Sequence, residues 1–107
     1  MYARCVTLTL TPNSRAEFTK KLEAEIIPLL RKQKGFQDEI TFIAPVGNEA
    51  LAVSLWDSKE SAEIYHRVGF LEVSKLLSPL VEGTPQVDSY DVANSTMHKI
   101  GAALKAA

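Results

Sequence analysis

Four short segments of this chain alternate between two kinds of side chain, and they constrain its fold more than any other feature. They run from Tyr2 to Thr11, Phe36 to Ile43, Glu49 to Trp56 and Val87 to Ala93. A period of two with many β-branched residues is typical of β-strands. Between these segments apolar residues recur every three or four positions, which is typical of amphipathic helices. The sequence therefore predicts strands and helices in one domain.

The first helix is predicted after the first strand. Ser14 with Glu17 has the spacing of a capping box, in which the two side chains satisfy free backbone N–H groups of the first turn. Gly35 lies where a left-handed residue ends many helices. Pro28 has no N–H to donate to the carbonyl of Ala24, so it predicts a kink in the last two turns.

A second helical region follows the third strand. Asp57 with Glu60 has the spacing of another capping box and predicts a helix through about Arg67. Gly69 interrupts it, and a further amphipathic turn or two ends before Pro79. The predicted order is thus β-α-β-β-α-α-β, an α+β, ferredoxin-like arrangement with an antiparallel sheet covered by helices on one face.

The last residues carry a weaker helical pattern. We expect residues 1–95 to form the domain and residues 96–107 a C-terminal helical tail, capped by Asn94 or Ser95 and carrying Met97, Ile100 and Leu104 on one face. Such a short helix is marginal alone in water. We therefore expect it to dock on a partner subunit or on the rim of the sheet, the alternative being a frayed end.

Composition excludes several classes of function. The chain of 107 residues has room for one domain, and its net charge of −1 gives no field that would attract nucleic acid or an anionic membrane. No apolar run approaches the length of a membrane span, and no leader is recognisable. The lone Cys5 rules out an internal disulfide and indicates a reducing, cytoplasmic location. His66 and His98 lack metal-ligand spacing, and no glycine-rich phosphate loop occurs, so we expect no metal and no cofactor.

The two faces of the predicted sheet differ in character. One collects large aliphatic and aromatic residues: Val6, Leu8, Leu10, Ile40, Phe42, Leu51, Val53 and Leu55. The other is small and Thr-rich, with Cys5, Thr7, Thr9, Thr41, Ile43, Ala50, Ala52, Ser54 and Trp56. We expect helices to cover the first face. The second lacks the charged residues of a solvated sheet, so we expect a second copy of the chain to cover it, the alternative being a half-solvated sheet.

Several of these residues resemble one known family. A Thr/Leu-rich first strand, the helix end Leu30-Arg31-Lys32-Gln33-Lys34-Gly35-Phe36, and the strand-to-helix passage Leu55-Trp56-Asp57-Ser58-Lys59-Glu60-Ser61-Ala62 are similar to the antibiotic biosynthesis monooxygenase (ABM) family. The order of elements matches along roughly residues 2–93. The resemblance implies a dimeric α+β barrel, in which two sheets face each other and each subunit holds a ligand cavity between its sheet and helices.

The resemblance also bears on chemistry. The haem-degrading branch of the superfamily uses an Asn, a Trp and a His at positions that fall on Val6, Tyr65 and Ser74 here. All three differ, and without the His no proximal iron ligand is present, so haem degradation is not expected. The cofactor-free, quinone-forming branch uses a looser set of polar and aromatic groups around an aromatic substrate.

Three residues are candidates for catalysis. Arg4 interrupts an otherwise aliphatic face, and a buried guanidinium needs an acceptor; alternatively it reaches water or pairs with Asp88 or Asp91. Tyr65 shares a helix face with Ala62 and Val68, as a catalytic hydroxyl or as a core residue. His66 lies off that face, as a general base at the cavity mouth or as an exposed residue.

Three aromatic residues, Trp56, Phe42 and Phe70, are expected to bind the substrate, although Trp56 could instead anchor packing or a dimer edge. Two functions follow. The first is a cofactor-independent monooxygenase acting on a small phenol or quinol. The second is a non-catalytic homodimer of the same fold that binds a small ligand or has a structural role.

Overall fold

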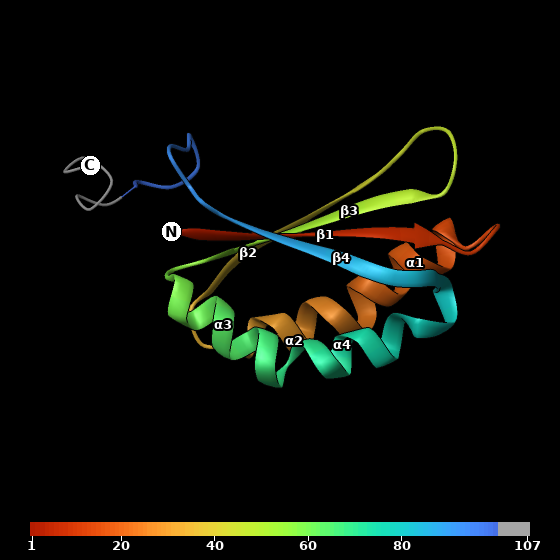
Figure 1. Ribbon diagram of the computed structural model, residues 1–107, viewed down its shortest axis with the longest axis horizontal. Helices are drawn as coiled ribbons and strands as arrows, with labels where there is room; N and C mark the ends of the chain where they lie inside the picture. Colours follow the sequence, from red (N-terminus) through yellow and green to blue (C-terminus); the bar gives the residue numbers. More distant parts are fainter. Residues whose placement is uncertain (101–107) are drawn as a thin grey trace.

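The computed structural model describes residues 1–100 and shows one layer of strands packed on one layer of helices (Figure 1). The sheet has four strands in the order β2-β3-β1-β4, each antiparallel to its neighbours. Their bounds are β1 (Tyr2–Leu10), β2 (Phe36–Ile43), β3 (Glu49–Trp56) and β4 (Val81–Asp91). The helices are α1 (Arg15–Lys21), α2 (Ile27–Arg31), α3 (Lys59–Val68) and α4 (Phe70–Leu77), with a π-helical turn η1 (Leu22–Ile26) and a 3-10 turn η2 (Ser78–Leu80). The predicted α+β, ferredoxin-like fold is confirmed.

The first helical region accommodates Pro28 through a change of helix type. Ahead of this proline the backbone widens into η1, where the N–H of Ile27 donates to the carbonyl of Leu22, five residues back. A proline removes a backbone donor and crowds the preceding turn, so a widened turn relieves both problems. Leu22 and Ile26 remain buried and form part of the core.

The helix caps differ from the two predicted capping boxes. Ser14 does precede α1, but its hydroxyl bonds the hydroxyl of Thr11 and caps no backbone N–H. Ser58, not Asp57, is the N-cap of α3, and its Oγ accepts a hydrogen bond of 3.1 Å from the N–H of Ser61. A serine hydroxyl at the N-cap can accept a hydrogen bond from the third N–H as well as a carboxylate can. The prediction that Asp57 caps this helix is therefore wrong.

On β1 the predicted faces are correct, but on β2 and β3 they are reversed. Val6 lies opposite Ala52 and Leu8 opposite Ala50, so the small residues of β3 share the helix-covered face with the large ones of β1. Trp56 also lies on this face and is fully buried, which corrects the expectation of a place at the dimer edge. On β3 small side chains fill the space under the helices, and the large ones point the other way.

A bulge explains the error on β2. Phe36 lies opposite Trp56 but Asp38 lies opposite Leu55, so the register shifts between them. Because successive residues of a strand alternate between faces, one extra residue moves everything after it to the other face. Phe36 therefore contacts Trp56 in the core, while Phe42 lies on the uncovered face.

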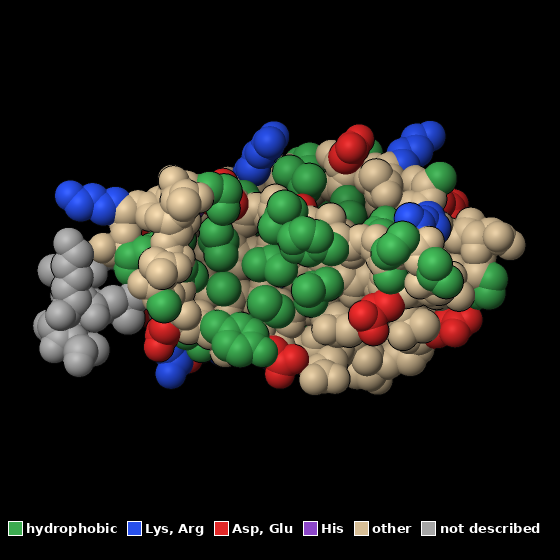
Figure 2. Space-filling view, turned by 90° about the horizontal axis from the view of Figure 1, so that it is seen from above, with side chains coloured by type: hydrophobic (Ala, Val, Ile, Leu, Met, Phe, Trp, Pro, Cys, Tyr) green, Lys and Arg blue, Asp and Glu red, His purple; other side chains and the backbone are tan. Residues whose placement is uncertain are grey.

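The uncovered side, called the open face below, is apolar. It is formed by Cys5, Thr7, Ile40, Phe42, Leu51, Val53, Leu55 and Tyr90. Figure 2 looks onto this side and shows apolar side chains gathered at its centre with charged ones around the edge. Ile40 and Phe42 are both 52% exposed.

The fourth strand begins earlier than predicted, at Val81 rather than Val87, and continues through Gly83 and Pro85. Its pairing with β1 is irregular between Thr7 and Thr9, which allows the strand to contain a proline and a left-handed glycine. No helix within residues 1–100 is long and apolar enough to cross a membrane.

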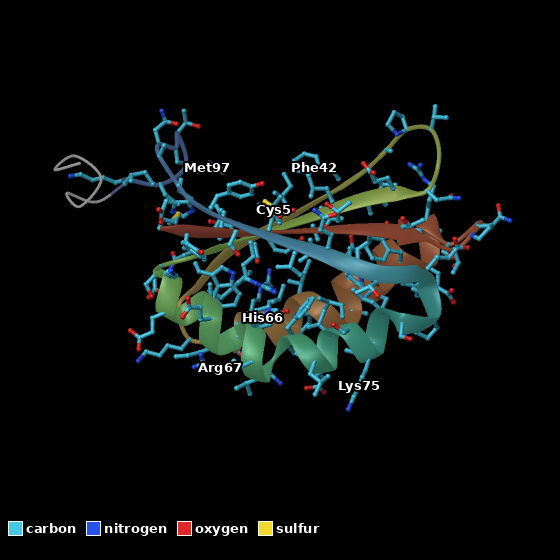
Figure 3. The ribbon with its side chains drawn as sticks, viewed as in Figure 1. Cys5, Phe42, His66, Arg67, Lys75 and Met97 are labelled. Atoms are coloured by element: carbon cyan, nitrogen blue, oxygen red, sulfur yellow. The ribbon has the colours of Figure 1, made fainter. Side chains whose placement is uncertain are left out.

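The chain after β4 rises on the open-face side. Residues 96–98 form bends and residues 99–100 are irregular, in place of the predicted helix, although the hydroxyl of Ser95 does accept hydrogen bonds from the N–H groups of Met97 and His98. The imidazole of His98 pairs with the carboxylate of Asp38 on β2. Figure 3 shows Met97 on the same side of the sheet as Phe42. Leu104, also assigned to this tail, lies outside the described residues.

Candidate functional site

Arg4 is a buried cation at the centre of the layer between sheet and helices. Only 3% of its surface is exposed. Its guanidinium Nη2 donates to Nδ1 of His66 over 2.9 Å, and its Cζ lies 5.0 Å from the ring centre of Tyr65 and 4.6 Å from that of Phe70. The charge is therefore held between two aromatic rings, an arrangement that favours a cation.

The secondary structure explains why these side chains meet. Arg4 occupies the central strand, opposite Ser54 on β3 and Ser89 on β4, so it points toward the helices. Tyr65 and His66 come from α3, which packs against that strand. Gly69 allows close packing between α3 and α4, because a Cβ at this position would lie 2.7 Å from Cδ1 of Tyr65.

Aromatic rings continue from this cluster into the core. Tyr65 stacks on Trp56 with ring centres 4.8 Å apart, and Phe70 lies edge-on to Tyr65 at 6.1 Å. His66 stacks on Phe70 at 5.5 Å. The indole Nε1 of Trp56 donates to the hydroxyl of Ser54 over 2.9 Å, so its polar atom is satisfied within the core. These contacts fix the rings that surround Arg4.

The charge of Arg4 is not compensated by any carboxylate of residues 1–100. Among residues 1–100, no Asp or Glu forms an ion pair with it. Asp88 lies opposite Cys5 and Asp91 opposite Tyr2, so the expected alternative of a pair with either carboxylate is wrong, as is the alternative of a side chain reaching water. Burial lowers the pKa of Arg4, although the neighbouring Tyr65 acts in the opposite direction. An uncompensated buried cation of this kind stabilises a bound anion.

Three hollows surround the cluster. The inner cavity, about 50 Å³, lies between sheet and helices and is mostly apolar, with Arg4, Glu39, Ser54 and Tyr65 as its polar lining residues. The α3 groove, about 380 Å³, opens beside α3 and reaches Arg4 and His66. The α4 groove, about 220 Å³, opens between α4 and β4 and shares Phe70 with the inner cavity.

Tyr65 and Glu39 ionise less readily in the cavity than in water. Burial raises the pKa of Tyr65 to about 12, and the charge of Arg4 offsets this only in part. Burial also raises the pKa of Glu39, against the effect of a hydrogen bond from the hydroxyl of Thr41. Tyr65 is therefore a hydrogen-bond donor at neutral pH, whereas the carboxyl of Glu39 is shifted toward the range in which a proton can be exchanged.

The structure brings together most of the residues singled out from the sequence. Arg4, Tyr65, His66 and Phe70 form one contact cluster, and Trp56 joins it through Tyr65. Tyr65 lines the inner cavity, while His66 lines the α3 groove outside it.

Phe42 does not join the cluster. Its side chain lies on the open face, away from the helices, as Figure 3 shows by comparison with His66. The expectation that Phe42 contacts a ligand in the cavity is thus wrong. Because β2 presents the opposite face from the one predicted, Glu39 was not among the predicted site residues, although it lines the cavity. No sequence signal marks the bulge between Phe36 and Asp38 that places Glu39 under the helices.

Comparison with known proteins identifies the fold. No family model and no curated protein sequence matches the chain. Among solved structures, a protein described as an antibiotic biosynthesis monooxygenase from Bordetella bronchiseptica is 17% identical, with a TM-score of 0.72 over 85% of this chain and 95% of that one. SnoaB, a cofactor-independent oxygenase from Streptomyces nogalater, is similar at 17% identity and a TM-score of 0.72, over 91% and 97% of the two chains. MhuD, solved with manganese protoporphyrin IX, is 14% identical, with a TM-score of 0.71 over 90% and 98%.

The cavity residues do not fit a porphyrin held by an axial histidine. Ser74, at the position where the resemblance would require that histidine, lies in the α4 groove. Within residues 1–100 the two imidazoles are engaged elsewhere, His66 with Arg4 and His98 with Asp38. Also within these residues, no cluster of three or more acidic, His or Cys side chains could hold a metal ion.

These solved structures match the fold of this chain over 85%, 91% and 90% of its length, respectively. The chain has the fold of the antibiotic biosynthesis monooxygenase family.

Proposed function

We propose that this protein is a cofactor-independent monooxygenase that acts on a small aromatic phenol or quinol bound between sheet and helices. The observation that carries the proposal is the buried Arg4, which faces an apolar cavity and has no carboxylate partner among residues 1–100. Reactions of this kind begin with an electron-rich organic anion, and a positive charge in a dry site stabilises that anion. The fold shared with SnoaB supports the same conclusion.

The reaction balances without a cofactor. A base removes the phenolic proton, and the resulting anion, whose negative charge Arg4 stabilises, transfers electrons to O2. A carbon–oxygen bond forms at the ring, and the peroxide loses water, so that one phenol and one O2 give one quinone and one water. The apolar lining excludes bulk water, which strengthens the interaction between Arg4 and the anion.

Tyr65 and His66 serve as hydrogen-bond donors in this proposal. Tyr65 retains its proton at neutral pH because its pKa is about 12. A guanidinium has only donors, so Nδ1 of His66 must be the acceptor in their contact, and the proton of the neutral imidazole lies on Nε2. His66 thus offers an N–H to a ligand in the α3 groove, in place of the general-base role expected from the sequence.

Substrate binding requires the inner cavity to widen. Its volume of about 50 Å³ is below the several hundred Å³ typical of ligand pockets. Phe70 lines both this cavity and the α4 groove of about 220 Å³, so rotation of its ring joins the two spaces. This assigns Phe70 to substrate binding, while Trp56 supports Tyr65 from behind.

We also propose that the protein is a homodimer paired through its open face. Large exposed side chains such as Ile40, Phe42 and Tyr90 gather there, and apolar patches of this kind are typical of interaction sites. A two-fold pair is the simplest cover, and a stable one should bury more than about 1,500 Å² in total.

The test of the oxygenase uses 1-naphthol and ¹⁸O2 in buffer containing a metal chelator. We expect oxygen uptake and one labelled oxygen atom in the naphthoquinone product, both lost in Arg4→Met and retained in Arg31→Met, a control at an exposed position of α2. Binding of 1-naphthol with no oxygen uptake above the buffer rate would replace the oxygenase with the ligand-binding alternative.

A further inference from the structure

Glu39 and Arg4 line the same cavity from opposite sides of β3. Glu39 on β2 lies opposite Ser54 on β3, and Ser54 lies opposite Arg4 on β1. Neighbouring strands are about 4.8 Å apart, so the two backbones are separated by roughly 10 Å. All three side chains line the inner cavity. An acid and a cation are thus placed at two ends of one apolar space, with a small residue between them.

The acid and the cation do not neutralise each other. Within residues 1–100 no ion pair joins Glu39 to Arg4, and the carboxylate instead accepts a hydrogen bond from the hydroxyl of Thr41, two residues along the same strand face. Both groups therefore remain available to a ligand that lies between them.

Only one group lining the inner cavity can act as a base at neutral pH. The titratable residues in the lining are Arg4, Glu39 and Tyr65. Arg4 has no lone pair to accept a proton, and Tyr65 keeps its own proton because burial raises its pKa to about 12. The hydroxyl of Ser54 already accepts a hydrogen bond from Trp56, and no base activates it. Glu39 remains.

We propose that Glu39 is the general base of the site and that Arg4 and Glu39 bind opposite ends of a para-substituted aromatic ring. The ring has an electron-accepting oxygen at one end, such as that of a conjugated carbonyl or nitro group, bound to Arg4, and a phenolic O–H para to it, facing Glu39. The carboxylate of Glu39 takes the proton of that O–H. The electron pair of the broken O–H bond stays on the phenolic oxygen and is delocalised through the ring, so that part of the negative charge lies on the oxygen at Arg4. This inference rests on the proposed oxygenase site and names its substrate class and its base.

The test separates this proton transfer from oxygen chemistry. The probe is 4-nitrophenol, bound under nitrogen, because its nitro group accepts charge para to its hydroxyl. Calorimetry in two buffers of different ionisation enthalpy counts the protons released on binding. For the wild type we expect the bound probe to absorb as the phenolate with no net proton release, since Glu39 keeps the proton.

Two variants and a second probe complete the experiment. In Glu39→Gln we expect either release of about one proton per bound phenolate or binding of the neutral phenol, whereas Glu72→Gln, at an exposed position of α4, behaves as wild type. We expect 3-nitrophenol, whose substituents are not para, to bind about tenfold more weakly or worse. A bound probe that absorbs as the phenolate in both wild type and Glu39→Gln, with equal proton counts, would overturn the assignment.

A folding defect in Glu39→Gln would not prevent the test, because Thr41→Val keeps the carboxyl and removes its hydrogen bond. That hydrogen bond favours the charged carboxylate, so its loss in Thr41→Val makes Glu39 the stronger base, and the bound probe should become phenolate at a pH as low as in the wild type or lower. A transition from bound phenol to bound phenolate at a higher pH than in the wild type would contradict the role of Glu39. If the wild type binds 4-nitrophenolate as described but consumes no oxygen with 1-naphthol, the proposed oxygenase function is disproved. The assignment of Glu39 as the base then stands.

Discussion

The guanidinium of Arg4 donates a hydrogen bond to Nδ1 of His66 across 2.9 Å and thereby selects one form of the imidazole. Because arginine cannot accept a proton, His66 must be neutral, with its proton on Nε2, for the contact to exist. A residue of α3 is in this way linked to the central strand of the sheet.

The tautomer of His66 is the first prediction. Ring ¹⁵N chemical shifts at neutral pH should identify the Nε2–H form in the wild type and a mixture of forms in Arg4→Met, where the donor is lost. The ring of His98, which pairs with Asp38 at the other side of the sheet, is the internal control and should not change. A wild-type His66 protonated on Nδ1 would contradict the contact.

Replacing Arg4 should separate stability from function. The side chain is buried and has no carboxylate partner among residues 1–100, so Arg4→Met removes an uncompensated charge and keeps the volume apolar. We expect the free energy of unfolding in urea to be unchanged or higher by about 1–3 kcal/mol, with loss of phenolate binding. Arg67→Met, on the exposed side of α3, should change stability by less than about 0.5 kcal/mol. A large loss of stability in Arg4→Met would mean that the cation is structural.

Tyr65 gives a prediction of pH dependence. Its pKa of about 12 in the fold lies above the ordinary value of 10.0, so folding favours the protonated phenol. The resulting stabilisation is complete below pH 10 and is lost as the pH rises through the folded-state value. The difference in tyrosinate absorbance between the wild type and Tyr65→Phe should have its midpoint near 12. A midpoint near 10 would place this hydroxyl in water.

Gly69→Ala should destabilise the protein even though alanine is the better helix former. The φ angle of Gly69 is −83°, which alanine adopts easily, and helix propensity alone would add about 1 kcal/mol of stability. The new Cβ would meet the ring of Tyr65 at 2.7 Å, however, and that ring is stacked on Trp56. We expect a net loss of about 1–3 kcal/mol by chemical denaturation, with Ser74→Ala on α4 as the control. A gain in stability would show that Tyr65 moves freely.

The open face gives a prediction about assembly. Phe42→Glu places a charge at the centre of the proposed dimer interface and should yield a monomer by light scattering at micromolar concentration. Ile64→Glu is the matched control, since Ile64 is 41% exposed on the outer side of α3, and it should remain a dimer. A monomeric wild type, or two variants of equal mass, would refute this interface.

The sequence was sufficient for the elements and their order, because alternation and helical spacing depend on local patterns. It failed on the faces of β2 and β3. Leu51, Val53 and Leu55 are larger than Ala50, Ala52 and Ser54, and larger apolar residues usually face the core. In a sheet whose second face is also apolar, size does not indicate which side carries the helices.

The candidate site could be predicted only in part, and the limit was again the assignment of strand faces. Arg4, Tyr65 and His66 were recognisable because β1 and α3 are regular, and their faces follow from spacing alone. Glu39 was not, because a bulge is a three-dimensional adjustment between two strands, and no single residue near Phe36 marks it. Its proximity to Arg4 also depends on the strand order, which places one strand between them.

The alternation along β1 divides one strand into two independent sets of positions. Arg4, Val6 and Leu8 face the cavity, while Cys5 and Thr7 face away from the helices. Mutational libraries can therefore randomise the first set to select new ligands while the second set, and with it the surface offered to a partner, stays constant. A substitution at Val6 or Leu8 can thus change the shape of the cavity while the open face keeps its side chains.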